Sequence, residues 1–354
     1  MIKQTTKISL HLENTPFGSI EKSRLLFFDI ETTGFTARSS SLYLIGCVAF
    51  LDGEWQAIQW FAENPAEESE ILSLFLDFSR NFSQLIHFNG DRFDLPFLQE
   101  KCRAYGLTDT LSPLLSRDLY TMIRPLKKLL GLSALNQKSL EQFMGLFRRD
   151  PYSGGELIQV YQEYVHSALS GDLNMLLLHN YEDLCGMLSI LPMLSYLCIT
   201  SGTYRITESE VQEDTLILYA RLPQSLPRPF SCRQDHFYLT GSQQRLAIQI
   251  NGTRQPLKHF FDDYKNYYYL PQEDTAIHKS VAAYVDKAYR EPAKASTCYS
   301  KKKGFYLPQF HPVFTPVFKE NYKDTLTYFA CTDAFLQDKE KMTDYIRHLI
   351  HSIL

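Results

Sequence analysis

The feature that most constrains this chain of 354 residues is an apolar run that ends in two carboxylates. Residues 26–31 contain three apolar residues followed by Asp29 and Glu31 on either side of Ile30, and Thr32, Thr33 and a glycine follow. Such a run predicts a buried strand that stops at a turn. Alternate strand residues point to the same face, so Asp29 and Glu31 would lie side by side. A divalent metal ion would offset two like charges held together, whereas a solvated acidic pair at the strand end is the alternative.

A second polar segment follows another short apolar run, residues 85–88. Asn89 opens a tight polar turn, and Phe93 and Asp94 come directly before a helical pattern. Asp94 therefore falls at a helix start, where a carboxylate can cap free backbone amides. Helix capping and metal binding are both open for Asp94 on this pattern alone.

A third segment lies in a long apolar and periodic stretch that runs to about Leu197. His179 and Asp183 are four residues apart, so they share one face of a helix. An acid within an apolar helix needs a partner, and the same face offers a candidate base.

These three motifs, in this order, resemble those of the DEDD-type (DnaQ-like) 3′-to-5′ exonucleases, which have a ribonuclease H-like fold. The match covers roughly residues 24–197. The YprB-like branch of that superfamily is the nearer resemblance, carried by Asp118-Leu119-Tyr120 and by His179-Asn180 before Asp183. Asp118 itself is expected to be a helix N-cap rather than a fifth ligand.

The resemblance implies a metal-dependent exonuclease that hydrolyses single-stranded DNA or RNA. Two Mg²⁺ or Mn²⁺ ions would be held by the four acids of the motifs, Asp29, Glu31, Asp94 and Asp183. The motif residues expected to contact nucleic acid are Thr32, Thr33, Asn89 and Phe93.

The resemblance gives His179 the role of general base. Members with a histidine usually place it five residues before the last aspartate, but here the spacing is four, so His179 could instead only orient substrate or water. Two other hypotheses for the whole protein stay open: a catalytically silent ribonuclease H-fold module that binds nucleic acid or a protein partner, and a structure-selective endonuclease.

Composition places the chain among globular proteins with room for two cores, because 44% of its residues are hydrophobic and 21% are charged. Its seven cysteines are odd in number and contain no C-x-x-C pair, which argues against a disulfide framework and a zinc site. No signal peptide and no run of about 20 apolar residues is visible. A cytoplasmic protein without a membrane partner is expected, and its protein partners are unknown.

We predict an N-terminal extension at residues 1–23 and a ribonuclease H-like domain at residues 24–200, an α/β fold with a mixed sheet flanked by helices. Its expected strands are Leu25–Ile30, Leu42–Phe50 and Glu54–Phe61, with a hairpin turn at Asp52-Gly53. A helix is expected from Glu67 to Arg80. Helices are also expected over most of residues 119–197, with breaks near Asp150-Pro151 and Ser170-Gly171.

Residues 201–354 predict a smaller α+β domain. Strands are expected at Thr215–Arg221, Phe237–Thr240 and Arg245–Ile250, with a hairpin turn at Asn251-Gly252. We expect a helix from about Thr275, capped by Asp274, and a last helix from about Asp333 to Leu354.

The net charge of −4 gives no support to a nucleic-acid partner, but a local basic patch can supply phosphate contacts. Arg148-Arg149 is one candidate. Another is residues 279–303, where seven basic residues face two acids and include Lys301, Lys302 and Lys303. Nearby tyrosines could stack on bases. The alternative is that Tyr267 to Tyr269 form a strand of a small sheet, where aromatic residues are favoured for packing alone. A substrate platform is therefore a hypothesis for this domain.

Overall fold

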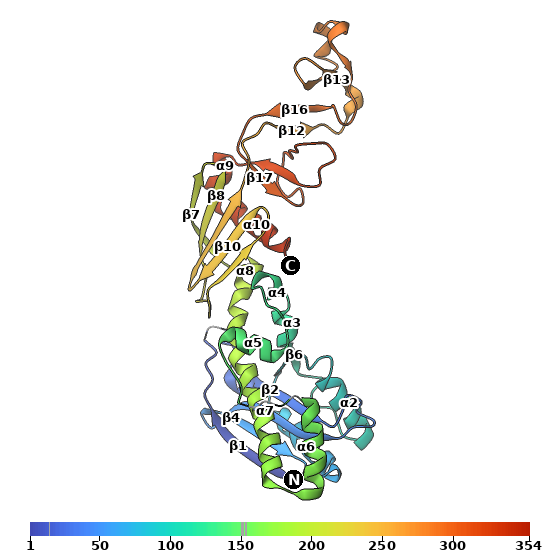
Figure 1. Cartoon of the computed structure of the whole chain (residues 1–354), viewed down its shortest axis with the longest axis vertical. Helices are drawn as coiled ribbons and strands as arrows, with labels where there is room; N and C mark the ends of the chain where they lie inside the picture. Colours follow the sequence, from blue (N-terminus) through green and yellow to red (C-terminus); the bar gives the residue numbers. More distant parts are fainter. Residues whose placement is uncertain (14, 150–151, 153) are drawn as a thin grey trace. The chain divides into compact units, whose positions relative to one another are not determined.

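Residues 1–13, 15–149, 152 and 154–354 are described by a computed structural model of the chain (Figure 1). The chain forms two compact units. The first contains residues 1–127 and 131–195, and the second contains residues 128–130 and 196–354.

The first unit is built on a mixed six-stranded sheet with the order β1-β4-β3-β2-β5-β6. Strands β1, β4, β3 and β2 pair antiparallel with their neighbours in this order. Strand β5 then pairs parallel with β2, and β6 pairs parallel with β5. The strand bounds are β1 Ile2–Ile8, β2 Leu25–Thr32, β3 Leu42–Leu51, β4 Glu54–Phe61, β5 Gln84–His87 and β6 Leu115–Asp118. This is the predicted mixed α/β sheet.

Helices cover both faces of this sheet. On one face, α1 and α2 pack their apolar residues against Phe28 and Ile30 of β2. On the other, α6 and α7 pack against β3 and β4, where Tyr43 and Tyr161 stack with ring centroids 4.2 Å apart. The helix bounds of this unit are α1 Glu68–Ser79, α2 Asp94–Tyr105, α3 Leu119–Ile123, α5 Gln137–Met144, α6 Gly154–Ser167 and α7 Ser170–Ile190. The short helix α4 is Leu126–Leu129, and α8 is Leu197–Ser201.

Most predicted elements of the first unit are confirmed. The Asp52-Gly53 turn joins β3 and β4, and both residues have positive φ, as a tight hairpin requires. Residues 1–23 are more than an extension, because β1 pairs along the whole of β4; mixed polar and apolar residues suit an edge strand. The predicted helix break at Ser170-Gly171 lies slightly earlier, at Ala168, which has a φ of 53°. The predicted break at Asp150-Pro151 falls outside the described residues.

The second unit contains a five-stranded antiparallel sheet with the order β7-β8-β11-β10-β9. Its strands are β7 Arg205–Gln212, β8 Thr215–Arg221, β9 Phe230–Arg233, β10 Phe237–Ser242 and β11 Arg245–Asn251. The remaining strands are β12 Leu257–Phe260, β13 Tyr267–Leu270, β14 Thr275–His278, β15 Glu291–Pro292, β16 Tyr299–Lys302, β17 Tyr306–Gln309 and β18 Thr327–Ala330. Two helices close the chain, α9 Asp333–Gln337 and α10 Lys339–His351.

Two predictions for the second unit are wrong. Residues 275–278 are not a helix but strand β14, which pairs with Tyr267 to Leu270. The hairpin turn lies at Gln243-Gln244 rather than at Asn251-Gly252, because the chain after β11 leaves the sheet and Thr253 pairs with Tyr306. The last helix is present, divided at Asp338, whose side chain caps α10.

Among the described residues, one helical stretch has the length and apolar composition of a membrane span. It is Ser170–Ser201, and 67% of its most apolar window is buried inside the structure. The sequence predicted no such stretch. Within it, α7 contacts β2, β3 and β4, so its apolar side forms part of the core of the first unit.

Candidate functional site

Strand β2 presents the two acids of the first motif on one face of the sheet. Phe28 and Ile30 point into the core beneath α1, and the alternation of a strand therefore turns Asp29 and Glu31 toward α7. Asp29 accepts a hydrogen bond from Asn180 of α7, and Glu31 lies beside His179 of the same helix. The sequence prediction that these two acids share a face is confirmed.

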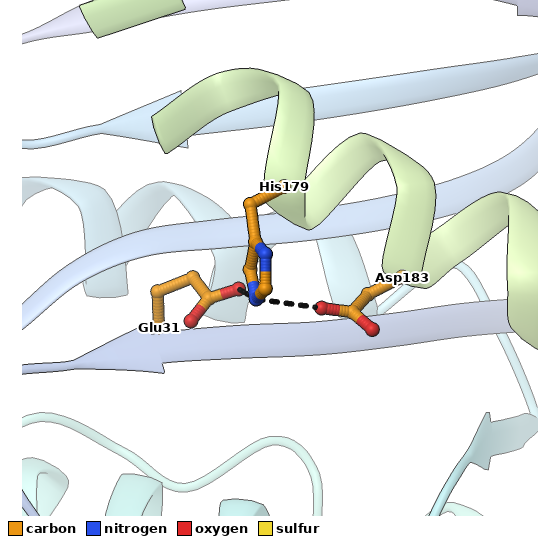
Figure 2. A group of neighbouring side chains, drawn as sticks. All are labelled: Glu31, His179 and Asp183. Carbon is orange, nitrogen blue, oxygen red and sulfur yellow. Dashed lines mark ion pairs between the residues drawn. The ribbon is translucent and has the colours of Figure 1, made fainter. Parts of the chain in front are cut away.

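Helix α7 brings the third motif to the same place. Figure 2 shows His179 and Asp183 projecting from neighbouring turns of α7 toward Glu31. The His179 Nε2 atom lies 3.2 Å from Asp183 Oδ2 and 3.9 Å from Glu31 Oε1. One ligand atom from each of these three residues lies within 4.8 Å of the others, so together they could hold a metal ion.

Asn180 fixes the first acid through a row of residues across three strands. In register, Asp29 pairs with Gly46 of β3, and Gly46 pairs with Gln59 of β4. Asn180 is fully buried above this row: Gln59 donates to its Oδ1 at 3.0 Å, and its Nδ2 donates to Asp29 at 3.0 Å. A Cβ atom on Gly46 would lie 1.9 Å from Asn180 Oδ1, so only glycine leaves room for this contact.

Asp94, the acid of the second motif, is the first residue of α2. Its side chain is only 7% exposed. Removal from solvent raises its pKa to about 7; backbone hydrogen bonds at Asp94 and Ile30 oppose this, and the charges of Asp118 and Asp183 add to it. The N-cap position itself is taken by Phe93, so helix capping does not explain why Asp94 is buried beside other acids.

The four predicted ligands act on one another electrostatically. Removal from solvent, followed by the charges of Asp183, Glu31 and Asp94, raises the pKa of Asp29 well above its usual value. Burial also raises the pKa of Glu31, and the charges of Asp183 and Asp94 contribute. A divalent cation would favour the charged forms of these groups. Four carboxylates with one imidazole beside them suit Mg²⁺ or Mn²⁺.

Arg148 is a residue whose role the sequence did not reveal. It was predicted as a candidate phosphate contact, but its Nη1 lies 2.7 Å from Asp183 Oδ1, and it donates two hydrogen bonds to buried Glu141. The Arg148 side chain is 9% exposed in this arrangement. Arg148 therefore positions Asp183, while its neighbour Arg149 stays exposed.

The predicted nucleic-acid contacts of the first unit line the loops that follow β2 and β5. The Thr32 hydroxyl donates to Gly34 O at 2.9 Å, and the Thr33 hydroxyl accepts from Ser41 N at 2.8 Å, so both shape the loop after Glu31. Asn89 has a φ of 62°, and its N–H donates to Asp118. Phe93 contacts Phe35, whose ring is 90% exposed and which the sequence did not single out.

Asp118 is confirmed as a helix N-cap. Its carboxylate accepts from Tyr120 N at 2.9 Å and from Asn89 N at 2.8 Å. It forms a second group of possible ligands with His87 and Asp91. Their polar atoms are already engaged, because His87 accepts from Gly90 N and bonds Ser116 Oγ.

The three predicted lysines lie in the second unit, at the end of β16. Lys301 contacts Asp274. Hydrogen bonds from Lys301, Tyr269 and Tyr299 to the carboxylate lower the pKa of Asp274. Lys302 and Lys303 are exposed. Tyr267 to Tyr269 form strand β13 of a three-stranded sheet, as one of the two alternatives expected.

A known family model matches part of this chain. Residues 26–195 match the model RNase_H_2, described as RNase H superfamily, and they include every predicted metal ligand. No curated protein matches the chain.

Several solved structures are similar to part of this chain at low identity. The family B DNA polymerase of Pyrobaculum calidifontis is 12% identical with a TM-score of 0.41, over 70% of this chain and 36% of that one. A product-bound exonuclease I is 13% identical with a TM-score of 0.31, over 42% of this chain and 44% of that one. A nuclease in its apo form is 16% identical with a TM-score of 0.33, over 51% of this chain and 76% of that one. This chain thus spans less than half the length of the first two.

Proposed function

We propose that the RNase H superfamily domain at residues 26–195 is a metal-dependent nuclease that hydrolyses phosphodiester bonds in nucleic acid. One observation carries the proposal: acids from β2, α2 and α7, which are up to 154 residues apart in the sequence, meet at a single place, where the charge of Asp183 raises the pKa of Asp29, Glu31 and Asp94. A fold has no structural reason to gather four carboxylates in this way, because each adds repulsion. A site for divalent cations supplies the reason.

Asp29, Glu31, Asp94 and Asp183 are the residues that would hold two Mg²⁺ or Mn²⁺ ions. When bound, the two ions would neutralise the charge of the phosphate and stabilise the attacking and leaving oxygens. The chain contributes the orientation of the ligands: Asn180 holds Asp29, and Arg148 holds Asp183. Such second contacts fix the direction of a ligand and tune its basicity.

His179 is proposed as the base that takes the proton from the attacking water. Its Nε2 faces the acids rather than the protein interior, at 3.2 Å from Asp183 Oδ2. An imidazole held at this distance from the acids can take a proton during the reaction. If His179 instead orients substrate, a glutamine that keeps a hydrogen-bonding group there would retain most of the activity.

We further propose that the enzyme is a DEDD-type 3′-to-5′ exonuclease of the YprB-like branch, acting on single-stranded DNA or RNA in the cytoplasm. The order of the three motifs supports this assignment. The exposed Phe35 ring beside Phe93 supports it too, since an aromatic face at the edge of the site can stack on an unpaired base. Thr32, Thr33 and Asn89 would contact the strand near the scissile phosphate.

The test is cleavage of single-stranded DNA and RNA oligonucleotides labelled at the 5′ end, with Mg²⁺, with Mn²⁺ and with EDTA. Wild type should give a ladder that shortens from the 3′ end only with metal. Asp29→Asn should abolish the ladder, whereas Asp52→Asn, the same change at the exposed turn after β3, should leave it intact.

Other outcomes separate the remaining candidates. Internal fragments from a strand with a blocked 3′ end would indicate an endonuclease. A folded protein that binds metal but cuts neither polymer would contradict the nuclease and favour the silent binding module.

A further inference from the structure

One face of the five-stranded sheet in the second unit carries arginines side by side on neighbouring strands. Arg221 of β8 pairs in register with Arg245 of β11, and on its other side with Arg205 of β7. Residues directly opposite each other in an antiparallel sheet have Cβ atoms about 4.5–5.5 Å apart, and like charges at such pairs are destabilising. Within the described part of the chain, none of the three guanidinium groups forms an ion pair.

Aromatic side chains accompany these arginines on the same face. Tyr219 is two residues before Arg221 on β8, and it pairs in register with Ala247 of β11 and, on its other side, with Glu208 of β7. The small alanine leaves the Tyr219 side chain 37% exposed. Tyr238 of β10 lies opposite Gln249, two residues after Ala247. The guanidinium carbon of Arg233 of β9 lies 4.8 Å from the centroid of the Tyr238 ring.

The opposite face of this sheet forms the core of the unit, so the arginine face is the free one. Residues that alternate with the arginines and tyrosines are buried, namely Ile206, Leu218, Ala220, Leu246 and Ile248. On the free face, a groove of about 760 Å³ is lined by Tyr219, Arg221, Gln244 and Arg245. Among the described residues that line this groove, Glu208 is the one acid.

We propose that this face, defined by Tyr219, Arg221, Arg245, Tyr238 and Arg233, binds single-stranded nucleic acid. Guanidinium groups bind phosphate through paired hydrogen bonds, and they are the residues of choice where phosphates must be read in a fixed geometry. Tyrosine rings between them offer stacking surfaces for unpaired bases. Arg221 Nη2 donates to Gln244 Oε1 at 3.3 Å, but no acid of the described residues forms an ion pair with Arg221 or Arg245, so anionic phosphates would also relieve the repulsion between them.

The choice of ligand rests on the proposed nuclease function, but the surface does not depend on catalysis. Binding is therefore measured in EDTA by fluorescence anisotropy, with full-length protein carrying Asp29→Asn and with labelled oligo(dT) and oligo(U). Failure of the nuclease proposal would leave this binding unchanged. Conversely, if the protein is a nuclease that binds nucleic acid through other residues, changes in this face would alter neither cleavage nor binding.

The decisive variant is R221Q/R245Q, and the matched control is K323Q/K339Q, which removes the same charge from exposed positions of the same unit. We expect R221Q/R245Q to weaken binding at least about tenfold. We also expect the slope of log affinity against log salt to fall by about 0.7 for each phosphate that the variant no longer neutralises. The control should change affinity by less than about twofold.

A second pair of variants tests stacking. Tyr219→Ala should weaken binding by at least about fivefold, whereas Tyr219→Phe, which keeps the ring, should bind like the parent. Removing the cross-strand repulsion should keep or raise the melting temperature of R221Q/R245Q at low salt.

Three results would overturn the proposal. The first is unchanged oligonucleotide binding by R221Q/R245Q. The second is an equal weakening in the K323Q/K339Q control. The third is a loss of affinity of R221Q/R245Q for phosphatidylserine vesicles that is as large as its loss of affinity for oligonucleotides. That result would assign the face to anionic membranes.

Discussion

The acids of the site are held in place by single neighbours, and Asn180 shows this most clearly. From helix α7 it joins Gln59 to Asp29 across the space that Gly46 leaves free. Its two hydrogen bonds set the direction of the Asp29 carboxylate before any cation is present. The sequence placed Asn180 in a motif, but its role depends on a contact across 151 residues and could not be predicted.

Asn180→Ala should therefore lower metal-dependent cleavage by about 10- to 100-fold, the usual cost of removing a group that orients a ligand. Asn174→Ala, at an exposed position of the same helix, should leave the rate unchanged. Single-turnover cleavage at saturating Mn²⁺ is the measurement. An Asn180→Ala enzyme as active as wild type would show that Asp29 needs no such support.

Arg148 permits a prediction about stability. Replacing it with alanine would leave the buried Glu141 carboxylate without its cationic partner, so the free energy of unfolding of the first unit should fall by about 3–5 kcal/mol. Arg149→Ala, at the exposed neighbouring residue, should stay within about 0.5 kcal/mol of wild type.

Urea unfolding followed by tryptophan fluorescence measures this directly, because both tryptophans, Trp55 and Trp60, lie in the first unit. Equal stability of the two variants would mean that the Arg148 ion pairs contribute nothing.

Hydrophobic periodicity and turn residues correctly predicted the strands and helices that depend on local sequence. Strands β2, β3 and β4 and the helix that carries His179 and Asp183 follow from periodicity and turn residues. The segment 275–278 does not, because four residues fit a strand or a helix equally well and the partner strand β13 decides between them. The turn at Gln243-Gln244 contains no glycine, so no local signal marked it.

Helix α10 contains a histidine that should make the second unit sensitive to pH. His348 Nε2 accepts a hydrogen bond from Phe310 N–H at 3.0 Å, which requires the neutral ring. Burial, with the charges of His311 and His351, lowers its pKa below 6.5. The unfolded chain then binds a proton more readily than the folded one, so the stability present above pH 6.5 is lost as the pH falls through the folded pKa.

Hydrogen exchange at the Phe310 amide should therefore become faster, relative to the intrinsic rate, as the pH is lowered from about 7.5 to 5.5. His348→Gln should remove this dependence, while His166→Gln, at an exposed position in the first unit, should keep it. A pH dependence that is unaltered in His348→Gln would place the sensitive group elsewhere.

At the scale of the whole molecule, the two units differ in how far sequence reasoning reached. In the first unit, the fold followed from motifs that resemble a known superfamily, and the match of residues 26–195 agrees, whereas the four acids as metal ligands stay a prediction. In the second unit, no motif was available, and its arginine face arises from register between strands that only the structure shows. Arg221 and Arg245 are unremarkable as separate positions in the sequence.

Calorimetric titration with Mn²⁺ measures whether Asp29, Glu31, Asp94 and Asp183 form one metal site. We expect two bound ions for the wild-type protein, and weaker or fewer bound ions for Asp183→Asn. Asp172→Asn, the same change in the first turn of α7, should bind like wild type. A folded wild-type protein that binds no Mn²⁺, or Mn²⁺ binding that Asp183→Asn leaves unchanged, would show that these acids do not form a metal site.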